Sequence, residues 1–285
     1  MPSVDDIPLK LPLPEGLTEE HLRGFSPLKK WHATLKHSLS LQHENSTHPF
    51  HKDPYSLRSV TVQSFDIFGR PPHQRLGFLK LIADVSNSSG EKLPSSIFLR
   101  GPSVAMLVML LPDDLPAGQE GEERYVVLTV QARIPAGSLE FVELPAGMVD
   151  DGTFSGAAAQ EIQEELGLEI PASELRNLSE MAAAGTVAAA AGSAGDKGGG
   201  EDLPAAVYPS AGGCDEFIPI FMHERRVPRE TLKEWTGKLT GLRDHGEKIT
   251  LKLVKMKDLW KEGRRDAKCL AALALWEGLR RENKL

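Results

Sequence analysis

Residues 144 to 168 read LPAGMVDDGTFSGAAAQEIQEELGL and predict a glycine-containing turn, a short loop and one helix. Thr153 or Ser155 can cap the start of this helix, because a hydroxyl oxygen accepts hydrogen bonds from the first free backbone N–H groups. The alanines at 157 to 159 favour a helix strongly, and Gly167 suits the left-handed conformation in which many helices end. The stretch therefore predicts a loop followed by a helix with defined ends.

The predicted helix has two chemically different faces. Apolar residues recur at every fourth position and predict a face that packs on a sheet, namely Ala158, Ile162 and Leu166. Three carboxylates share the other face, at i, i+3 and i+4, and are expected to point outward: Glu161, Glu164 and Glu165. Like charges this close repel one another, whereas clustered carboxylate oxygens are the ligands that Mg²⁺ requires. The alternative is a solvated acidic face that holds no ligand.

The same stretch resembles the signature of the Nudix hydrolases, G-x5-E-x7-R-E-U-x-E-E-x-G-U, in which U is an aliphatic residue. The matching positions are Gly147, Glu161, Ile162, Glu164, Glu165, Gly167 and Leu168. The sequence departs from the signature in a loop that is one residue shorter, in Thr153 where a glutamate is usual, and in Gln160 where an arginine is usual. Gln160 cannot form the ion pair by which that arginine steadies a neighbouring glutamate. The resemblance implies a hydrolase that keeps its metal-binding glutamates.

Composition limits the classes of function. The 285 residues include 33 basic and 40 acidic side chains, for a formal net charge of −7, without a block of Lys or Arg. This balance predicts no nucleic-acid partner, because such binding requires a concentrated positive surface. No apolar run reaches the roughly 18 residues of a membrane span, so no membrane partner is expected. Two distant cysteines and a start unlike a signal or transit peptide predict a cytoplasmic location.

The pattern along the chain predicts an α+β fold in three parts. Residues 1–57 are rich in Pro, His and Ser and predict a partly irregular extension with one helix near Leu28 to Leu41. Residues 58–100 alternate apolar and polar side chains and predict a small antiparallel sheet. Residues 101–285 predict the hydrolase domain, with an Ala- and Gly-rich insert at 181–206 that is expected to be a mobile surface loop.

The end of the chain, from Asp258 to Asn283, predicts one closing amphipathic helix. Cys269, Leu273 and Trp276 lie at i, i+4 and i+7 and are expected to face the core.

Four segments, in order along the chain, extend the resemblance to the ADP-ribose and ADP-sugar diphosphatases, particularly the plant-type ADP-sugar and animal UDP-glucose enzymes. They are FLRGPSVAMLVML (98–110), TVQARIPAGSLEFVELPAGMVDD (129–151), YPSAGGCDEF (208–217) and TGLRDHGEKITLKLV (240–254). This resemblance implies an N-terminal sheet domain that helps to form a homodimer, followed by a Nudix α/β/α sandwich.

The resemblance also implies roles for single residues. It assigns Arg100 to the nucleotide end of the substrate, Arg133 to the diphosphate, Glu143 to a substrate contact and the backbone carbonyl of Ala146 to a metal ion. The turn implied to hold the terminal sugar contains Ser210, Gly212, Gly213 and Glu216, with Ala211 where proline is usual. The alternatives are a surface cation for Arg100, a strand-end carboxylate for Glu143 and an ordinary turn.

These assignments predict a hydrolase that cleaves the diphosphate bond of a nucleoside diphosphate sugar, such as ADP-ribose, ADP-glucose or UDP-glucose. Mg²⁺ is the expected cofactor, with Mn²⁺ as an alternative. Glu247 resembles a loop glutamate that acts as general base or further metal ligand, and His245 is the reserve because imidazole titrates near neutral pH. Two alternatives stay open: hydrolysis of another nucleoside diphosphate derivative, and a catalytically weak module that binds nucleotide sugars.

Overall fold

The computed structural model describes residues 4–71, 74–116, 118, 121–149, 153–184, 200–241 and 248–285. The chain divides into two compact units. The N-terminal unit comprises the described residues of Met1–Pro102, Val187–Pro204 and Ser210–Phe217. The C-terminal unit comprises those of Ser103–Thr186, Ala205–Pro209 and Ile218–Leu285.

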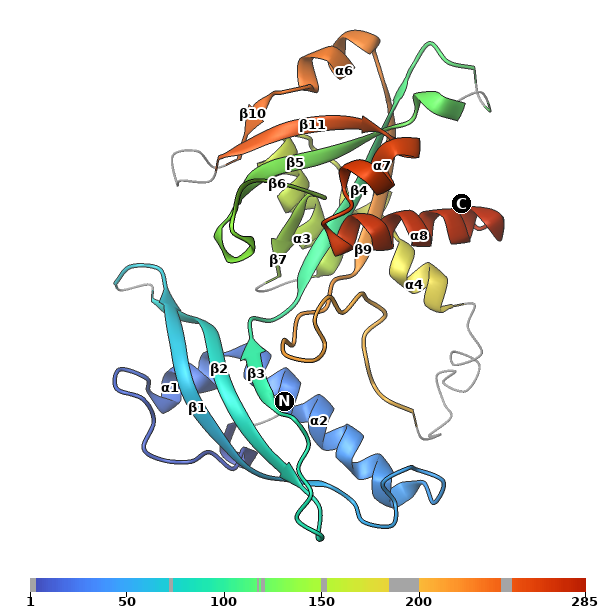
Figure 1. Cartoon of the computed structure of the whole chain (residues 1–285). Helices are drawn as coiled ribbons and strands as arrows, with labels where there is room; N and C mark the ends of the chain where they lie inside the picture. Colours follow the sequence, from blue (N-terminus) through green and yellow to red (C-terminus); the bar gives the residue numbers. More distant parts are fainter. Residues whose placement is uncertain are drawn as a thin grey trace. The chain divides into compact units, whose positions relative to one another are not determined.

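The N-terminal unit packs helices on one face of an antiparallel sheet with strand order β1-β2-β3 (Figure 1). Its elements are η1 (Val4–Asp6), α1 (Glu19–Gly24), α2 (Ser26–Glu44), β1 (Ser56–Phe68), β2 (Arg75–Ser86) and β3 (Ser96–Leu99). Alternate residues of β2 are buried, as the period of a strand with one covered face requires, including Leu79, Leu81, Ala83 and Val85. The helix predicted near Leu28 to Leu41 is part of α2.

Residues 1–57 share a core with this sheet. Leu22 and Leu28 of the two helices are fully buried in the same cluster as Val60 and Leu79 of the strands. The sequence prediction treated this segment as a separate extension, because its Pro- and His-rich composition concealed the few apolar residues that bury it. The small sheet therefore obtains its covered face from the residues that precede it.

The other face of the small sheet carries a row of aromatic side chains. The rings of Phe68 and Phe78 lie 4.8 Å apart between centroids, and those of Phe78 and Phe98 lie 5.1 Å apart. Phe98 and Ile82 remain 36% and 41% exposed. Within the N-terminal unit this face therefore leaves apolar surface uncovered.

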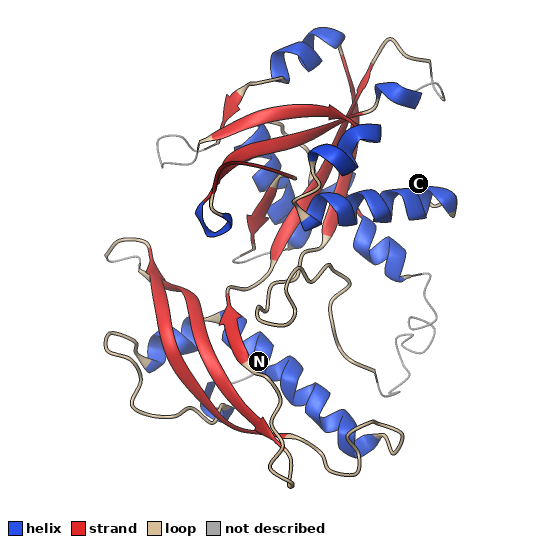
Figure 2. Ribbon diagram, viewed as in Figure 1, coloured by secondary structure: helices blue, strands red, loops and turns tan. Residues whose placement is uncertain are grey.

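The C-terminal unit is built on a mixed sheet with strand order β10-β11-β5-β4-β9-β8, to which β6 and β7 add through β5 and β4 (Figure 2). Its strands are β4 (Ser103–Pro112), β5 (Tyr125–Arg133), β6 (Ser138–Glu143), β7 (Ala146–Met148), β8 (Arg176–Asn177), β9 (Ile220–Val227), β10 (Leu239–Thr240) and β11 (Ile249–Lys255). Its α-helices are α3 (Phe154–Glu161), α4 (Leu178–Ala183), α6 (Arg229–Trp235), α7 (Leu259–Glu262) and α8 (Ala267–Arg281). Its short helical turns are η2 (Gly121–Glu123), η3 (Ile134–Ala136), η4 (Ile162–Leu166), η5 (Ala172–Glu174) and η7 (Met256–Asp258). Strands β4 and β9 pair in parallel.

Both faces of this sheet are covered by helices. Every residue of β4 is buried, and its side chains alternate between two cores. Leu107 and Met109 pack with α4 and α8 in one core. Val108 packs with α3, η4 and α6 in the other. The predicted α+β fold, with a small antiparallel sheet before an α/β/α sandwich, is confirmed.

Two predicted elements have different bounds. The closing helix predicted from Asp258 to Asn283 is divided into α7 and α8, because Asp266 starts a new helix by accepting the backbone N–H of Lys268 at 3.1 Å. The tract predicted as a mobile loop at 181–206 begins with the last turn of α4. Cys269 and Trp276 lie in the core as expected. Among the described helices, none is long and apolar enough to cross a membrane.

Candidate active site

The loop and helix predicted from residues 144 to 168 form β7, α3 and η4 of the C-terminal unit. Thr153 caps α3, and its Oγ1 accepts the backbone N–H of Gly156 at 3.1 Å. Gly167 ends the helical stretch with a φ of 69°, in the left-handed region that a side chain would disfavour. The predicted sheet-facing residues, Ala158, Ile162 and Leu166, are fully buried.

Glu161 lies against the backbone of Gly147. A Cβ atom added at Gly147 would overlap the Glu161 carboxylate, so only glycine allows this approach. Strand β7 is fixed in turn by its pairing with β4, where Val104 lies opposite Gly147 and Ala105 opposite Ala146. The structure thus brings together the Glu161 carboxylate and the Ala146–Gly147 backbone, two parts of the predicted metal site.

The other two glutamates of the trio differ in burial. Glu164 is half-buried and accepts the side-chain amide of Gln160 at 2.9 Å, whereas Glu165 is only 2% exposed. Residues 162–166 form a π turn, and Glu165 is one of its buried residues. The prediction that Glu165 points outward is therefore wrong.

The oxygen atoms of these residues are the kind of ligand that a hard divalent cation prefers, but they are not clustered closely in this conformation. In the parts of the chain that the structure describes, no three His, Cys, Asp or Glu side chains lie close enough together to hold a metal ion. The Glu161 carboxylate and the nearby backbone carbonyl of Ala146 supply oxygen ligands of the kind that Mg²⁺ prefers. Glu164 offers a further carboxylate on the adjoining turn. These residues fit a divalent ion once Glu164 turns away from Gln160.

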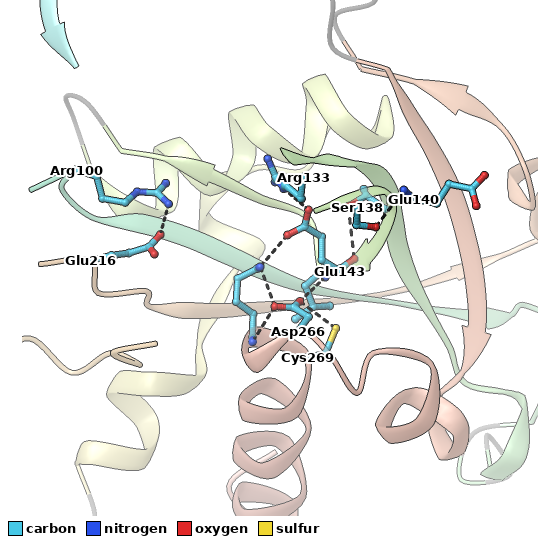
Figure 3. Close-up of polar contacts among 11 residues, drawn as sticks. Arg100, Arg133, Ser138, Glu140, Glu143, Glu216, Asp266 and Cys269 are labelled. Atoms are coloured by element: carbon cyan, nitrogen blue, oxygen red, sulfur yellow. Dashed lines mark hydrogen bonds and ion pairs between the residues drawn. The ribbon is translucent and has the colours of Figure 1, made fainter. Parts of the chain in front are cut away.

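Arg133 and Glu143, predicted at the substrate, form an ion pair at the ends of two neighbouring strands (Figure 3). Arg133 Nε donates to Glu143 Oε1 at 2.6 Å. The second oxygen, Glu143 Oε2, accepts Lys268 Nζ at 3.0 Å, and Lys268 also binds Asp266 Oδ1 at 2.9 Å. The four residues, here called the buried ion network, balance two positive and two negative charges.

Asp266 joins this network to the signature stretch. Its Oδ2 accepts the backbone N–H of Leu144 at 2.9 Å and the Cys269 thiol at 3.2 Å. Burial would lower the pKa of Lys268, but the carboxylates of Asp266 and Glu143 outweigh it and raise this pKa above its usual range. Burial and the Asp266 carboxylate raise the pKa of Cys269, which keeps its thiol protonated. Lys268 is therefore a permanent cation in the network.

Arg100 and Glu216 form a corresponding pair within the N-terminal unit. Arg100 Nη1 lies 3.2 Å from Glu216 Oε1. Asp215 accepts the backbone N–H of Arg100 at 2.8 Å and that of Gly101 at 3.2 Å. Burial raises the pKa of Asp215, although these N–H donors and Arg100 oppose the shift.

The predicted sugar turn packs beside β3 in the same unit. Ser210 O accepts the backbone N–H groups of Gly213 and Cys214 at 3.1 and 2.9 Å, which closes the turn. Gly213 O accepts the N–H of Phe98 at 2.8 Å, and Phe98 O accepts the N–H of Asp215 at 3.3 Å. A Cβ atom at Gly212 or Gly213 would meet nothing within 4 Å, so room for an atom of that size remains beside both residues.

Sequence reasoning missed Asp215, Asp266 and Lys268. Asp266 had a local signal, since an aspartate before an alanine-rich run is typical of a helix start. Lys268 had none, because its partner Glu143 is distant in sequence. The candidate bases His245 and Glu247 lie outside the described residues.

The α/β/α sandwich and the loop-helix that places Glu161 on Gly147 are features of a Nudix hydrolase, and the comparison with known proteins identifies the chain as a member of that family. It is 33% identical over 288 aligned positions to Nudix hydrolase 14, chloroplastic, of Arabidopsis thaliana, an alignment that covers 99% of this chain and 81% of that protein. No family model matches the chain. A solved structure described as an ADP compounds hydrolase superposes with a TM-score of 0.44 at 16% identity, over 81% of this chain and 99% of that one.

Proposed function

We propose that this Nudix hydrolase cleaves the diphosphate bond of a nucleoside diphosphate sugar of the ADP-ribose, ADP-glucose or UDP-glucose type. The products are a nucleoside monophosphate and a sugar phosphate. The observation that carries the proposal is Arg133, whose guanidinium is fixed through Nε to a buried glutamate yet stays 40% exposed. A guanidinium fixed in this way can present its terminal nitrogens to phosphate oxygens.

Glu161, Glu164, Glu165 and the Ala146 carbonyl are the residues we propose to hold Mg²⁺, or Mn²⁺ in its place. Nudix hydrolases in general use divalent metals. When bound, such an ion neutralises charge on the phosphoryl oxygens and makes a bound water more acidic. Glu165 is 2% exposed, so water competes little for its carboxylate.

The remaining assignments follow from the resemblance and stay proposals. Arg100 and Glu216 contact the nucleotide or sugar, and Ser210, Gly212 and Gly213 offer hydroxyl and backbone groups to the sugar. Glu247 is the proposed general base, with His245 as the reserve. Glu143 is better suited to positioning Arg133 than to touching the substrate, because both of its oxygens accept bonds from cations.

We also propose a homodimer formed through the open face of the small sheet. The aromatic row of Phe68, Phe78 and Phe98 leaves apolar surface exposed there, which a second copy would bury. The expectation of a cytoplasmic location, without nucleic-acid or membrane partners, stays a prediction; the name of the Arabidopsis relative places that protein in the chloroplast.

The decisive experiment measures phosphate release by a coupled phosphatase on a panel of nucleotide sugars, with Mg²⁺, with Mn²⁺ and with chelator. Metal-dependent turnover of at least one nucleotide sugar, abolished in Glu161→Gln, is the expected result. If the enzyme hydrolyses only a dinucleoside polyphosphate or a coenzyme A ester, the proposed substrate class of nucleotide sugars is wrong.

The second candidate function is binding of nucleotide sugars with little turnover. It is favoured by Gln160, which binds Glu164 through a neutral amide where the family signature has an arginine. Micromolar affinity by calorimetry without measurable product would establish this alternative, and Gln160→Arg is then expected to raise turnover.

A further inference from the structure

We infer that Lys268 is a positioning residue that fixes Glu143, and through Glu143 the guanidinium of Arg133, in the orientation that binds a diphosphate. This inference rests on the proposed function, since it assigns Arg133 to the diphosphate. Lys268 lies in the first turn of α8, 125 positions from Glu143.

The Glu143 carboxylate binds two cations, one at each oxygen. Its Oε1 accepts Arg133 Nε at 2.6 Å and its Oε2 accepts Lys268 Nζ at 3.0 Å. The Glu143 side chain is 4% exposed and the Lys268 side chain 14% exposed, so water competes little for these contacts. A carboxylate bound at both oxygens has one orientation, and that orientation sets the direction of Arg133 Nε.

Lys268 separates the carboxylates of Glu143 and Asp266. Its ammonium lies between Glu143 Oε2 and Asp266 Oδ1, at 3.0 and 2.9 Å. Asp266 cannot withdraw, because its oxygens also accept the backbone N–H groups of Leu144 and Lys268. Without the ammonium, two buried carboxylates would repel each other, and Glu143 is the one free to move. Its movement would carry Arg133 Nε with it.

Arg133 is bound at one side of its guanidinium and is partly exposed. The contact that the described residues give it uses Nε, and 40% of its side chain is exposed. The Nη1 and Nη2 atoms are at the end of the guanidinium opposite to that contact, where they can bind two oxygens of one anion. Lys268 therefore acts on the anion through Glu143 and Arg133, not by contact.

The test uses two measurements on the full-length protein that do not require turnover. The first is the ¹H–¹⁵N resonance of the Arg133 Nε–H, assigned by its absence in Arg133→Gln, and its exchange rate with water. The second is the Kd for inorganic pyrophosphate in chelator. Lys252→Met is the control for loss of a lysine ion pair as such, because Lys252 pairs with Glu262 at 2.6 Å outside the buried ion network and nearer the surface.

In Lys268→Met we expect the Nε–H resonance to shift and exchange faster, and the Kd for pyrophosphate to rise about tenfold. In the Arg133→Gln background, Lys268→Met is expected to change that Kd no further, since Arg133 is the group through which Lys268 acts. Lys252→Met should alter neither measurement. An unchanged Nε–H resonance in Lys268→Met, or a tenfold Kd effect that persists without Arg133, overturns the inference.

Lys268→Arg keeps the test decisive if Lys268→Met does not fold. It retains the charge but cannot place a single ammonium between the two carboxylates. The Nε–H resonance should shift and the Kd should rise by about threefold; no change in either one overturns the inference. Failure of the proposed function would appear separately, as absence of nucleotide-sugar hydrolysis with the Nε–H result intact.

Discussion

The two arginine–glutamate pairs that contain the predicted substrate-binding arginines, one in each unit, are fixed in different ways. Arg133 and Glu143 are 2.6 Å apart, and the second oxygen of Glu143 accepts Lys268, which Asp266 binds in turn. Arg100 and Glu216 are 3.2 Å apart, and Asp215 accepts the backbone N–H groups of Arg100 and Gly101. Side chains position the first arginine, and main-chain hydrogen bonds position the second.

The difference teaches where each pair is vulnerable. In the buried ion network every charge depends on its neighbours, so removal of one leaves another buried and uncompensated. Around Arg100, loss of Asp215 leaves two backbone N–H groups without an acceptor but creates no isolated charge. Substitutions in the buried ion network should therefore lower the free energy of unfolding more than substitutions around Arg100.

The largest effect is expected for Asp266→Ala. This change removes one acceptor of Lys268, the cap of α8 and the acceptor of the buried Leu144 N–H. The free energy of unfolding of the C-terminal unit should fall by about 3 to 5 kcal/mol. Urea unfolding of a Trp31→Phe background followed by tryptophan fluorescence measures it, since the other three of the four tryptophans, Trp235, Trp260 and Trp276, lie in this unit.

Asp258→Ala is the control for that measurement. Asp258 occupies the corresponding position before α7 but makes no side-chain cap bond, so its loss should change the unfolding free energy by less than about 0.5 kcal/mol. Equal losses in the two variants would mean that the buried ion network adds nothing beyond ordinary helix capping.

The next effect concerns activity and compares Arg133→Lys with Arg100→Lys. A lysine at 133 keeps the charge but cannot bind Glu143 and two phosphate oxygens at once. We expect kcat/KM on the preferred nucleotide sugar to fall about 100-fold in Arg133→Lys, and only about tenfold in Arg100→Lys, chiefly through KM. A larger loss from Arg100→Lys would reverse the ranking of the two pairs.

How much of these pairs the sequence could predict depends on the range of the interactions. The helix with its Thr153 cap, its Gly167 end and its buried apolar face was predictable because neighbours within one turn determine it. The π turn and the burial of Glu165 were not, since no local residue type specifies them. Arg100 and Arg133 were found by resemblance alone.

The residues that fix Arg100 and Arg133 could not be predicted from the spacing of residues along the sequence. Lys268 reaches Glu143 across 125 positions, and Asp215 reaches the Arg100 backbone across 115. Such contacts arise only when sheet and helices have assembled, and each uses a residue type that is common on surfaces. The division of 1–57 from the small sheet failed for the same reason: composition describes a segment, not the partner that buries it.

A smaller effect is expected for Asp215→Ala in the N-terminal unit. The backbone N–H groups of Arg100 and Gly101 lose their acceptor, which should cost about 1 to 3 kcal/mol of unfolding free energy. Hydrogen exchange of these two amides measures the local loss. Asp84→Ala is the control, because its ion pair with Lys92 lies near the surface and should cost less than about 1 kcal/mol. Exchange rates unchanged in Asp215→Ala would show that the backbone clamp does not hold Arg100.

The smallest effect is the pH dependence that Asp215 adds. Burial raises its pKa in the folded chain above the ordinary aspartate value, so the folded state binds a proton at pH values where the unfolded chain has released it. Its contribution to stability is therefore fully present below the unfolded pKa and is lost as the pH rises through the raised pKa.

Asp53 in the same unit supplies a contrast of opposite sign. Hydrogen bonds from Ser88 and Ser89 lower the pKa of Asp53 to about 2, so its stabilising contribution is present above the ordinary aspartate value and is lost as the pH falls toward 2. Unfolding of the wild type, Asp215→Asn and Asp53→Asn is measured by urea titration at steps between pH 3 and 7. Relative to the wild type, Asp215→Asn should gain stability as the pH rises through this range, because asparagine does not release the proton that Asp215 loses at a cost, and Asp53→Asn should lose it. Parallel curves of unfolding free energy against pH for Asp215→Asn and the wild type would mean that the backbone N–H donors fully offset the effect of burial on the pKa of Asp215. The ionised Asp215 carboxylate would then bind the Arg100 backbone without loss of stability, and the contrast with the buried ion network would not extend to pH dependence.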